Sequence, residues 1–237
     1  MMTYTTFQEK PYRPRRRLKR SWRIALTVLC AALALSAVYV AVLVRRQLGS
    51  NQNPADLSST PGYGVAVPDW VEEDLLPLNA YSRPGEALPE ISGVVIHYVG
   101  NPGTSAQANR NYFAGLARTG ETSASSHFIV GLEGEILQCV PLSEISYCSN
   151  TRNYDTIAIE VCHADDTGQF SPDTLASVER LTAWLCVQFD LDTDQVIRHY
   201  DVSGKICPKY YVEHQEAWTD LLAGVEKDIR GFTDKTA

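Results

Sequence analysis

An uncharged apolar run near the N-terminus is the feature that most constrains how this chain can fold. Ile24 to Val44 make up 21 consecutive positions without a charged side chain, and a helix needs about 20 such residues to span a bilayer. Eight Lys and Arg side chains precede the run, whereas only Arg45 and Arg46 follow it closely. Because cationic flanks remain in the cytoplasm, we expect residues 1–23 inside, a transmembrane helix over 24–44 and the rest of the chain outside.

A cleaved signal peptide is the alternative to a retained anchor. The apolar region of a signal peptide spans about 7–15 residues and ends at a small-residue cleavage site. This run is longer, and Arg45-Arg46 closes it without an Ala-x-Ala pattern. We therefore expect a cell-membrane anchor, followed by a flexible extracytoplasmic linker over residues 45–75 and a folded domain over 76–230.

The charge of the expected outer part excludes one class of partner. Residues 47–237 carry 11 Lys and Arg against 27 Asp and Glu, a net charge of −16, whereas the whole chain carries −7. Nucleic-acid binding depends on many contacts between cations and phosphates. We expect no nucleic-acid partner, and we interpret the basic N-terminus as a determinant of topology that can also contact anionic lipid headgroups.

The domain alternates short apolar strand patterns with longer amphipathic helix patterns. This alternation predicts an α/β layered domain around a mixed sheet. Strands are expected over 93–98, 126–130, 136–140, 156–162 and 195–200, helices over 105–118, 171–189 and 212–229, and a short helix over 69–76. The segments 126–130 and 136–140 are close enough to form a hairpin.

Two histidines and one cysteine stand out as candidate metal ligands. His97 ends the apolar run Val94-Val-Ile, His199 follows a second apolar run, and Cys207 lies eight residues further on. Each alone has an ordinary explanation, as a structural histidine or a small buried thiol. Together they form a ligand set that zinc selects, with a fourth position open for water. Lys205 would place a cation beside the group that the metal polarises, so the pattern predicts a zinc hydrolase.

Four motifs between about Leu75 and Val225 extend this interpretation. They are Val95-Ile-His-Tyr98 with Asn101-Pro-Gly103, Ser125-Ser-His-Phe-Ile-Val130, Ile157-Ala-Ile-Glu-Val161, and Arg198-His-Tyr-Asp-Val-Ser-Gly-Lys-Ile-Cys-Pro208. In order and spacing, the chain resembles the type-2 N-acetylmuramoyl-L-alanine amidases, a zinc family that also contains the peptidoglycan recognition proteins. The resemblance implies a sheet of five or six strands with helices on both faces.

The resemblance also assigns roles to residues of this chain. It implies that His97, His199 and Cys207 bind Zn²⁺, that Glu160 is the acid/base carboxylate, and that Lys205 stabilises the oxyanion of the transition state. It implies a peptidoglycan or muropeptide substrate, cleaved between N-acetylmuramic acid and the L-Ala of the stem peptide. A non-catalytic peptidoglycan-binding receptor on the same fold is one alternative, and a zinc amidase or protease that acts on another peptide is a second.

The chain departs from the family pattern at one position. Ser126 stands where some members carry a catalytic or substrate-binding Tyr, which leaves Glu160 as the expected base. The neighbouring His127 either packs beneath the site or lines it. Asn101, Arg110 and Asn111 are weaker candidates for the rim of a substrate groove, and Asp201 is either a partner of a metal-bound histidine or a turn residue.

The remaining cysteines outside the apolar run leave one question open. Cys139 and Cys148 flank a short segment and could form a disulfide in an oxidising compartment, although sequence does not determine connectivity. Cys162 and Cys186 fall within a strand pattern and a helix pattern, and we expect both to be packed thiols.

Overall fold

The computed structural model describes residues 57–234 together with the single residues Leu29 and Ser36. The basic N-terminus and, apart from those two positions, the expected transmembrane run lie outside the described residues. Within the described part of the chain, no helix has both the length and the apolar character needed to cross a bilayer. The fold described here lies in the unit Gln52–Ala237.

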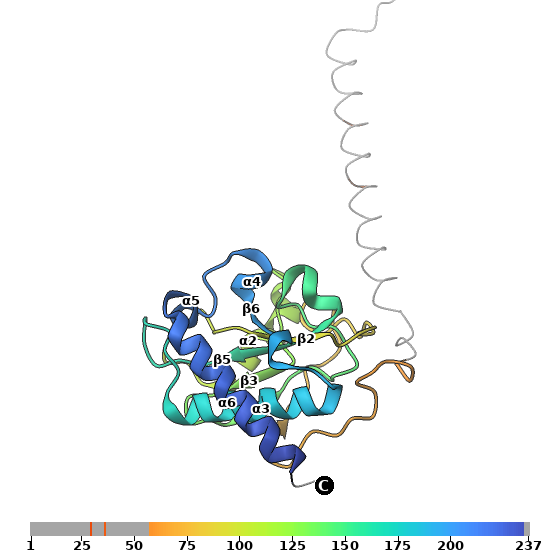
Figure 1. Cartoon of the computed structure of the whole chain (residues 1–237). Helices are drawn as coiled ribbons and strands as arrows, with labels where there is room; N and C mark the ends of the chain where they lie inside the picture. Colours follow the sequence, from red (N-terminus) through yellow and green to blue (C-terminus); the bar gives the residue numbers. More distant parts are fainter. Residues whose placement is uncertain (1–28, 30–35, 37–56, 235–237) are drawn as a thin grey trace, which may run out of the picture. The chain divides into compact units, whose positions relative to one another are not determined.

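Six short strands form one mixed sheet, part of which is visible in Figure 1. In spatial order they are β1 (Glu72–Glu73), β4 (Ile136–Gln138), β3 (Phe128–Val130), β5 (Thr156–Val161), β2 (Gly93–Ile96) and β6 (Val196–Arg198). The hairpin pair β3–β4 is antiparallel, and the other neighbouring pairs are parallel. The expected mixed sheet and hairpin are confirmed.

Helices pack on both faces of this sheet. One core joins the β5 residues Ile157 and Ile159 to Leu185 of α3 (Pro172–Phe189) and Leu221 of α6 (Gln215–Thr233), and α3 and α6 contact each other (Figure 1). A second core joins Ile129 of β3 to residues of α2 (Ala106–Thr119) on the opposite face. Successive strand residues point to opposite faces, so Glu160 projects from the face opposite α3 and α6.

The two long helices that open after a serine begin where the sequence predicts. The side chains of Ser105 and Ser171 accept hydrogen bonds from the backbone N–H groups of Ala108 and Thr174, which would otherwise be unpaired in the first turn. The helix α2 ends at Gly120, whose φ of 60° lies in the left-handed region that glycine adopts without strain.

Three expected element boundaries are wrong. The short helix expected over 69–76 is replaced by β1, because the backbone N–H groups of Asp74 and Leu76 pair with the carbonyls of Gln138 and Cys139 beside β4. The last strand ends at Arg198, and α4 (His199–Ser203) begins where the strand was expected to continue. The closing helix is divided at His214 into α5 (Lys209–Glu213) and α6. The sheet thus begins a few residues before position 76.

Candidate metal centre

The register of three parallel strands brings the candidate residues together at the carboxyl edge of the sheet. Ile96, the last residue of β2, pairs with Ile159 of β5 on one side and with Arg198 of β6 on the other. The residues that follow these three in the sequence are His97, Glu160 and His199 respectively. His97 continues the ladder by donating its backbone N–H to Ile159 O at 2.9 Å, which fixes the direction of its side chain.

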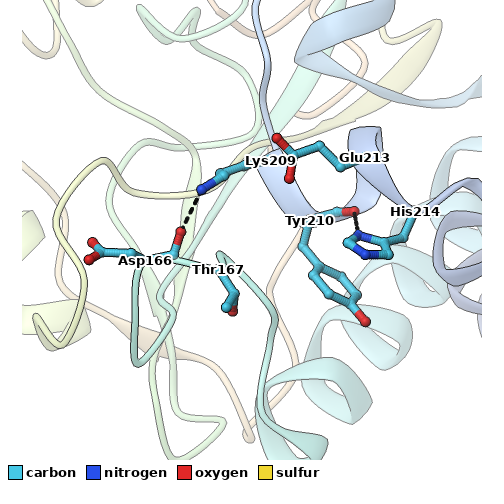
Figure 2. Close-up of a pocket in the computed structure, with 6 residues that line it drawn as sticks. All are labelled: Asp166, Thr167, Lys209, Tyr210, Glu213 and His214. Carbon is cyan, nitrogen blue, oxygen red and sulfur yellow. Dashed lines mark hydrogen bonds between the residues drawn. The ribbon is translucent and has the colours of Figure 1, made fainter.

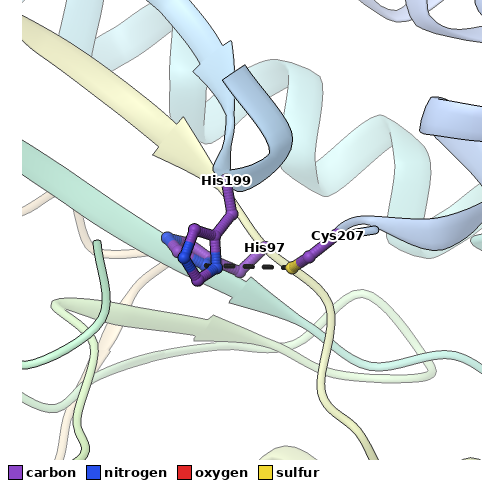
Figure 3. A group of neighbouring side chains, drawn as sticks. All are labelled: His97, His199 and Cys207. Carbon is purple, nitrogen blue, oxygen red and sulfur yellow. Dashed lines mark hydrogen bonds between the residues drawn. The ribbon is translucent and has the colours of Figure 1, made fainter. Parts of the chain in front are cut away.

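His97, His199 and Cys207 converge in space, as Figure 3 shows. All three residues are buried, and each offers a ligand atom within 4.8 Å of the others. His97 Nδ1 lies 3.1 Å from His199 Nδ1 and 3.9 Å from Cys207 Sγ. Two imidazole nitrogens that face each other must share a proton or donate their lone pairs to a common cation. This group could therefore bind a metal ion.

The electrostatic setting keeps both imidazoles neutral, which is the form that binds metals. Burial lowers the pKa of His97 well below its ordinary value, and the charges of His199 and Lys205 lower it further. Burial also lowers the pKa of His199, again with a contribution from Lys205. Nε2 of His199 is buried and has no hydrogen-bond partner among the described residues.

Cys207 contributes the third candidate ligand atom from the loop between α4 and α5. Burial and, secondarily, the charge of Glu160 raise the pKa of its thiol to about 12, although a backbone hydrogen bond from Tyr98 and the charge of Lys205 lower it. Only a bound cation would make this thiol a thiolate at neutral pH, since coordination deprotonates a thiol. The sulfur therefore has the setting of a ligand rather than of a free nucleophile.

Glu160 stands beside the metal-ligand group. Its Oε1 accepts a hydrogen bond from the Cys148 thiol at 3.5 Å, and its Oε2 is buried with no hydrogen-bond partner in the described part of the chain. Burial raises the pKa of Glu160 to about 7, while the Cys148 hydrogen bond and the positive charge of Lys205 lower it. A carboxyl group with this pKa can both accept and return a proton near neutral pH.

Lys205 approaches the same site from the loop that precedes Cys207. Its positive charge lowers the pKa values of His97, His199, Glu160 and Cys207. Lys205 is exposed, and its ammonium group has no ion-pair partner among residues 57–234. This cation is available to a negative charge that develops in the site.

Sequence reasoning missed two further residues at the site. Cys148 contacts Glu160, and Ser149 Oγ lies 3.0 Å from Nε2 of His97. For the two missed residues, the only indication in the sequence was that Cys148 lies a few positions before the strand that carries Glu160.

The possible Cys139–Cys148 disulfide does not form: both are free thiols, with Cys139 buried in the second core. Cys162 and Cys186 are buried free thiols, as expected.

The structure decides between the two possibilities for His127. Its Nδ1 lies 3.1 Å from Ser146 Oγ and accepts the Ala158 backbone N–H, and its Nε2 lies 2.8 Å from the Glu144 carbonyl. Every polar atom of this buried ring thus has a partner within the domain. His127 is a packed structural residue beneath the site, and its neighbour Ser126 is buried and donates to Phe128 O.

Two weaker candidates have structural partners. Arg110 forms an ion pair with Asp74 at 2.9 Å and donates to the carbonyls of Asp74 and Leu75, which ties α2 to the segment after β1. Asp201 pairs with Arg198 and accepts its backbone N–H, so it is a turn residue at the start of α4. Asn101 and Asn111 are exposed.

A separate pocket lies beyond Cys207, between α5 and the turn after β5 (Figure 2). Its volume is about 460 Å³, and it is lined by Asp166, Thr167, Lys209, Tyr210, Glu213 and His214. Lys209 Nζ crosses it to donate to the Asp166 carbonyl at 2.7 Å. None of the expected site residues lines this pocket, so it is distinct from the metal-ligand group.

Fold and site together define an α/β domain with a buried His-His-Cys group at the carboxyl edge of its sheet. Residues 87–210 match the model of the N-acetylmuramoyl-L-alanine amidase family, Amidase_2, and the chain belongs to that family. The chain is 32% identical over 169 residues to the N-acetylmuramoyl-L-alanine amidase CwlL of Bacillus licheniformis, covering 66% of this chain and 46% of CwlL.

Further comparisons agree with this assignment. The chain is 30% identical to the N-acetylmuramoyl-L-alanine amidase BlyA of Bacillus subtilis, covering 66% of this chain and 47% of that protein. The chain thus spans about half the length of these two relatives. Among solved structures, a mutant endolysin from Bacillus subtilis superposes with a TM-score of 0.56 at 27% identity, over 65% of this chain and 97% of the endolysin.

Proposed function

We propose that this protein is a zinc-dependent N-acetylmuramoyl-L-alanine amidase that hydrolyses the amide bond between N-acetylmuramic acid and the L-Ala of the peptidoglycan stem peptide. Membership of the family and the names of the relatives support this activity. The observation that carries the proposal is the convergence of His97, His199 and Cys207 beside the buried carboxylate of Glu160.

The geometry of the three donors fits zinc. A tetrahedral zinc ion lies about 2.0–2.1 Å from nitrogen and about 2.3 Å from sulfur, which separates pairs of ligand atoms by roughly 3.3–3.6 Å. The spacings of 3.1 Å between the two Nδ1 atoms and 3.9 Å between His97 Nδ1 and Cys207 Sγ bracket that range. His97, His199 and Cys207 would hold the ion, which when bound lowers the pKa of water and polarises the substrate carbonyl.

The remaining steps belong to this chain's own side chains. Glu160 would accept a proton from the attacking water at Oε2, which has no hydrogen-bond partner among residues 57–234. It would pass that proton to the departing nitrogen of L-Ala, because its pKa of about 7 suits both transfers. Lys205 would place its ammonium group against the carbonyl oxygen as negative charge develops there. The products would be a free lactyl carboxylate and a peptide with a free amino terminus.

A non-catalytic receptor would need neither the proton-transferring carboxylate of Glu160 nor the cation of Lys205, which has no ion-pair partner in the described part of the chain. The decisive experiment is digestion of purified muropeptides by the full-length protein, followed by mass spectrometry of the products. Release of the intact stem peptide with a free L-Ala amine supports the proposal. Binding without cleavage would favour the receptor, and cleavage within the stem peptide would favour a peptidase.

We also propose that the domain acts outside the cell membrane, anchored by residues 24–44 and joined to the anchor by the following linker. Support comes from the length of the apolar run and from the excess of cations before it. A wall-facing position would give the acidic domain direct access to peptidoglycan, its proposed substrate.

A further inference from the structure

One dipeptide of the loop between β4 and β5 touches both halves of the proposed catalytic centre. Ser149 Oγ lies 3.0 Å from Nε2 of His97, and Cys148 Sγ lies 3.5 Å from Oε1 of Glu160. Ser149 is buried, and ligand atoms of His97, Cys148 and Glu160 lie within 4.8 Å of one another. Adjacent side chains of a single loop therefore contact a metal-ligand histidine and the acid/base carboxylate.

The backbone of this dipeptide is held by the amide side chain of Asn153. Asn153 Oδ1, in the short helix η1 (Asn150–Tyr154), accepts the backbone N–H groups of Cys148 at 3.1 Å and of Ser149 at 2.6 Å. Just before them, Tyr147 exchanges backbone and side-chain hydrogen bonds with Ser125. These bonds restrain the backbone of Tyr147, Cys148 and Ser149. The Cys148 thiol and the Ser149 hydroxyl are therefore held at fixed positions.

The contact with Ser149 determines which nitrogen of His97 can bind a metal. Nδ1 of His97 faces His199 and Cys207, so Nε2 is the nitrogen that must carry the proton in a neutral, metal-binding ring. The Nε2–H group then donates to Ser149 Oγ. Such an outer partner fixes both the tautomer and the orientation of a ligand histidine.

The contact with Cys148 distinguishes the two oxygens of Glu160. Oε1 accepts the thiol hydrogen, whereas Oε2 has no hydrogen-bond partner among the described residues. A carboxylate held by one oxygen offers the other in a defined direction. Cys148 thus leaves Oε2 free for the proton that the reaction transfers.

We propose that Cys148 and Ser149 are positioning residues: Ser149 orients His97 for metal binding, and Cys148 orients Glu160 for proton transfer. The inference rests on the proposed amidase function for Cys148, but the role of Ser149 in metal binding can be measured without any catalytic assay.

The test of Ser149 is the zinc affinity of the full-length Ser149→Ala protein, measured by competition with a chromophoric chelator. We expect a loss of about 10–100-fold, the usual effect of removing an outer partner of a ligand histidine. Ser146→Ala is the matched control, since Ser146 Oγ lies 3.1 Å from the ring of His127, which contributes no candidate ligand atom. The control should lose thermal stability but keep zinc affinity.

An affinity of Ser149→Ala within about twofold of the unaltered protein would overturn the proposal, as would an equal loss in Ser146→Ala. The melting temperature of the metal-free proteins separates the two effects. A positioning role predicts that Ser149→Ala weakens zinc binding by more than its metal-free stability explains, because the lost bond acts on the ligand itself.

The test of Cys148 compares Cys148→Ala with Cys148→Ser in muropeptide cleavage. Cys148→Ala should lower kcat about tenfold or more, with KM and zinc affinity unchanged, because an outer partner acts through the group that it orients. Cys148→Ser retains a hydrogen-bond donor and should recover most of the loss. An unchanged kcat in Cys148→Ala, or a serine variant as impaired as the alanine variant, would refute this role. If the unaltered protein cleaves no muropeptide, the amidase proposal fails. The zinc affinity of Ser149→Ala remains a valid test of the Ser149 role in that case, because it does not depend on catalysis.

Discussion

His97 Nδ1 lies 3.1 Å from His199 Nδ1, although 102 positions separate the two residues in the sequence. The pairing of β2 with β6 brings them together, since each histidine follows a paired strand residue at the same edge of the sheet. Cys207 completes the group from a loop rather than from a strand. Metal binding should therefore depend on all three residues, although they come from separate parts of the chain.

The first prediction concerns this group. The purified protein should contain about one zinc per chain, the usual content of a catalytic site, and the double variant His97→Ala, Cys207→Ser should contain almost none by elemental analysis. Cys186→Ser is a suitable control because Cys186 is an equally buried thiol within α3. Stoichiometric zinc in the double variant would show that the metal is held elsewhere.

The second prediction concerns Glu160. Glu160→Gln should retain zinc but lose most hydrolysis, because an amide cannot accept and return the transferred proton. Its side chain has nearly the same shape and can still accept the Cys148 hydrogen bond, so the melting temperature should change little. The quantities to measure are zinc content and the initial rate of muropeptide cleavage. Near-normal cleavage would exclude Glu160 as the base, and His127 would not replace it, since its ring atoms are already paired.

The third prediction concerns Lys205. Lys205→Ala should lower kcat by about 10²–10³, the effect seen when a donor to a developing oxyanion is removed, while KM and zinc content stay close to their original values. Lys209→Ala is the control, because this nearby lysine donates to Asp166 O outside the metal-ligand group. A rise in KM without a fall in kcat would instead assign Lys205 to substrate binding.

The fourth prediction concerns pH and stability through His127. Burial lowers the pKa of His127 to about 4, from an ordinary value of 6.5. Between these two values the unfolded chain binds a proton that the folded chain does not, so stability falls as pH drops from about 6.5 to about 4. One such proton changes the free energy of unfolding by about 1.4 kcal/mol per pH unit.

His97 and His199 act in the same direction, so the test of His127 is a difference between proteins. The free energy of unfolding is measured by urea titration at several pH values across this range. Its dependence on pH should be weaker in His127→Gln than in the unaltered chain, by the equivalent of about one bound proton. The glutamine variant is itself expected to be less stable at pH 7, because the buried hydrogen bonds to Ser146, Ala158 and Glu144 will be imperfect. Equal slopes in the two proteins would show that His127 does not titrate in this way.

The sequence was sufficient to predict features that depend on periodicity and on strand ends. Apolar runs at 94–96 and 157–159 lie in the central strands β2 and β5, and the residues that follow the paired Ile96 and Ile159 are His97 and Glu160. Cys207 and Lys205 lie in a loop, where periodicity gives no information, so they were predicted from their residue types near His199 and then assigned roles by the resemblance. The structure brings His97, His199 and Cys207 together, while their role as zinc ligands remains a prediction.

The features that could not be predicted depend on contacts between distant segments. The helix expected over 69–76 is a strand because β4 offers unpaired backbone groups at the edge of the sheet, which no local pattern in that segment reveals. Cys148 and Ser149 reach the site because Asn153 holds their backbone. A short loop of this kind is specified by a few side-chain hydrogen bonds, so its residues appeared in the sequence only as a possible disulfide partner and an unremarked serine.

The last prediction concerns topology and rests on the sequence alone. Eight cations precede Ile24, two follow Val44, and the 21 residues between them can span a bilayer. On intact cells stripped of their wall, added protease should remove the amidase domain and leave a membrane-embedded fragment of about 5 kDa, as expected for an anchor of this length. A cytoplasmic protein followed in the same samples should remain intact, which shows that the membrane is closed. If the domain is degraded only after lysis, it faces the cytoplasm, and wall peptidoglycan cannot be its direct substrate. If the domain instead appears in the medium without added protease, the apolar run acts as a cleaved signal peptide and the retained anchor is wrong.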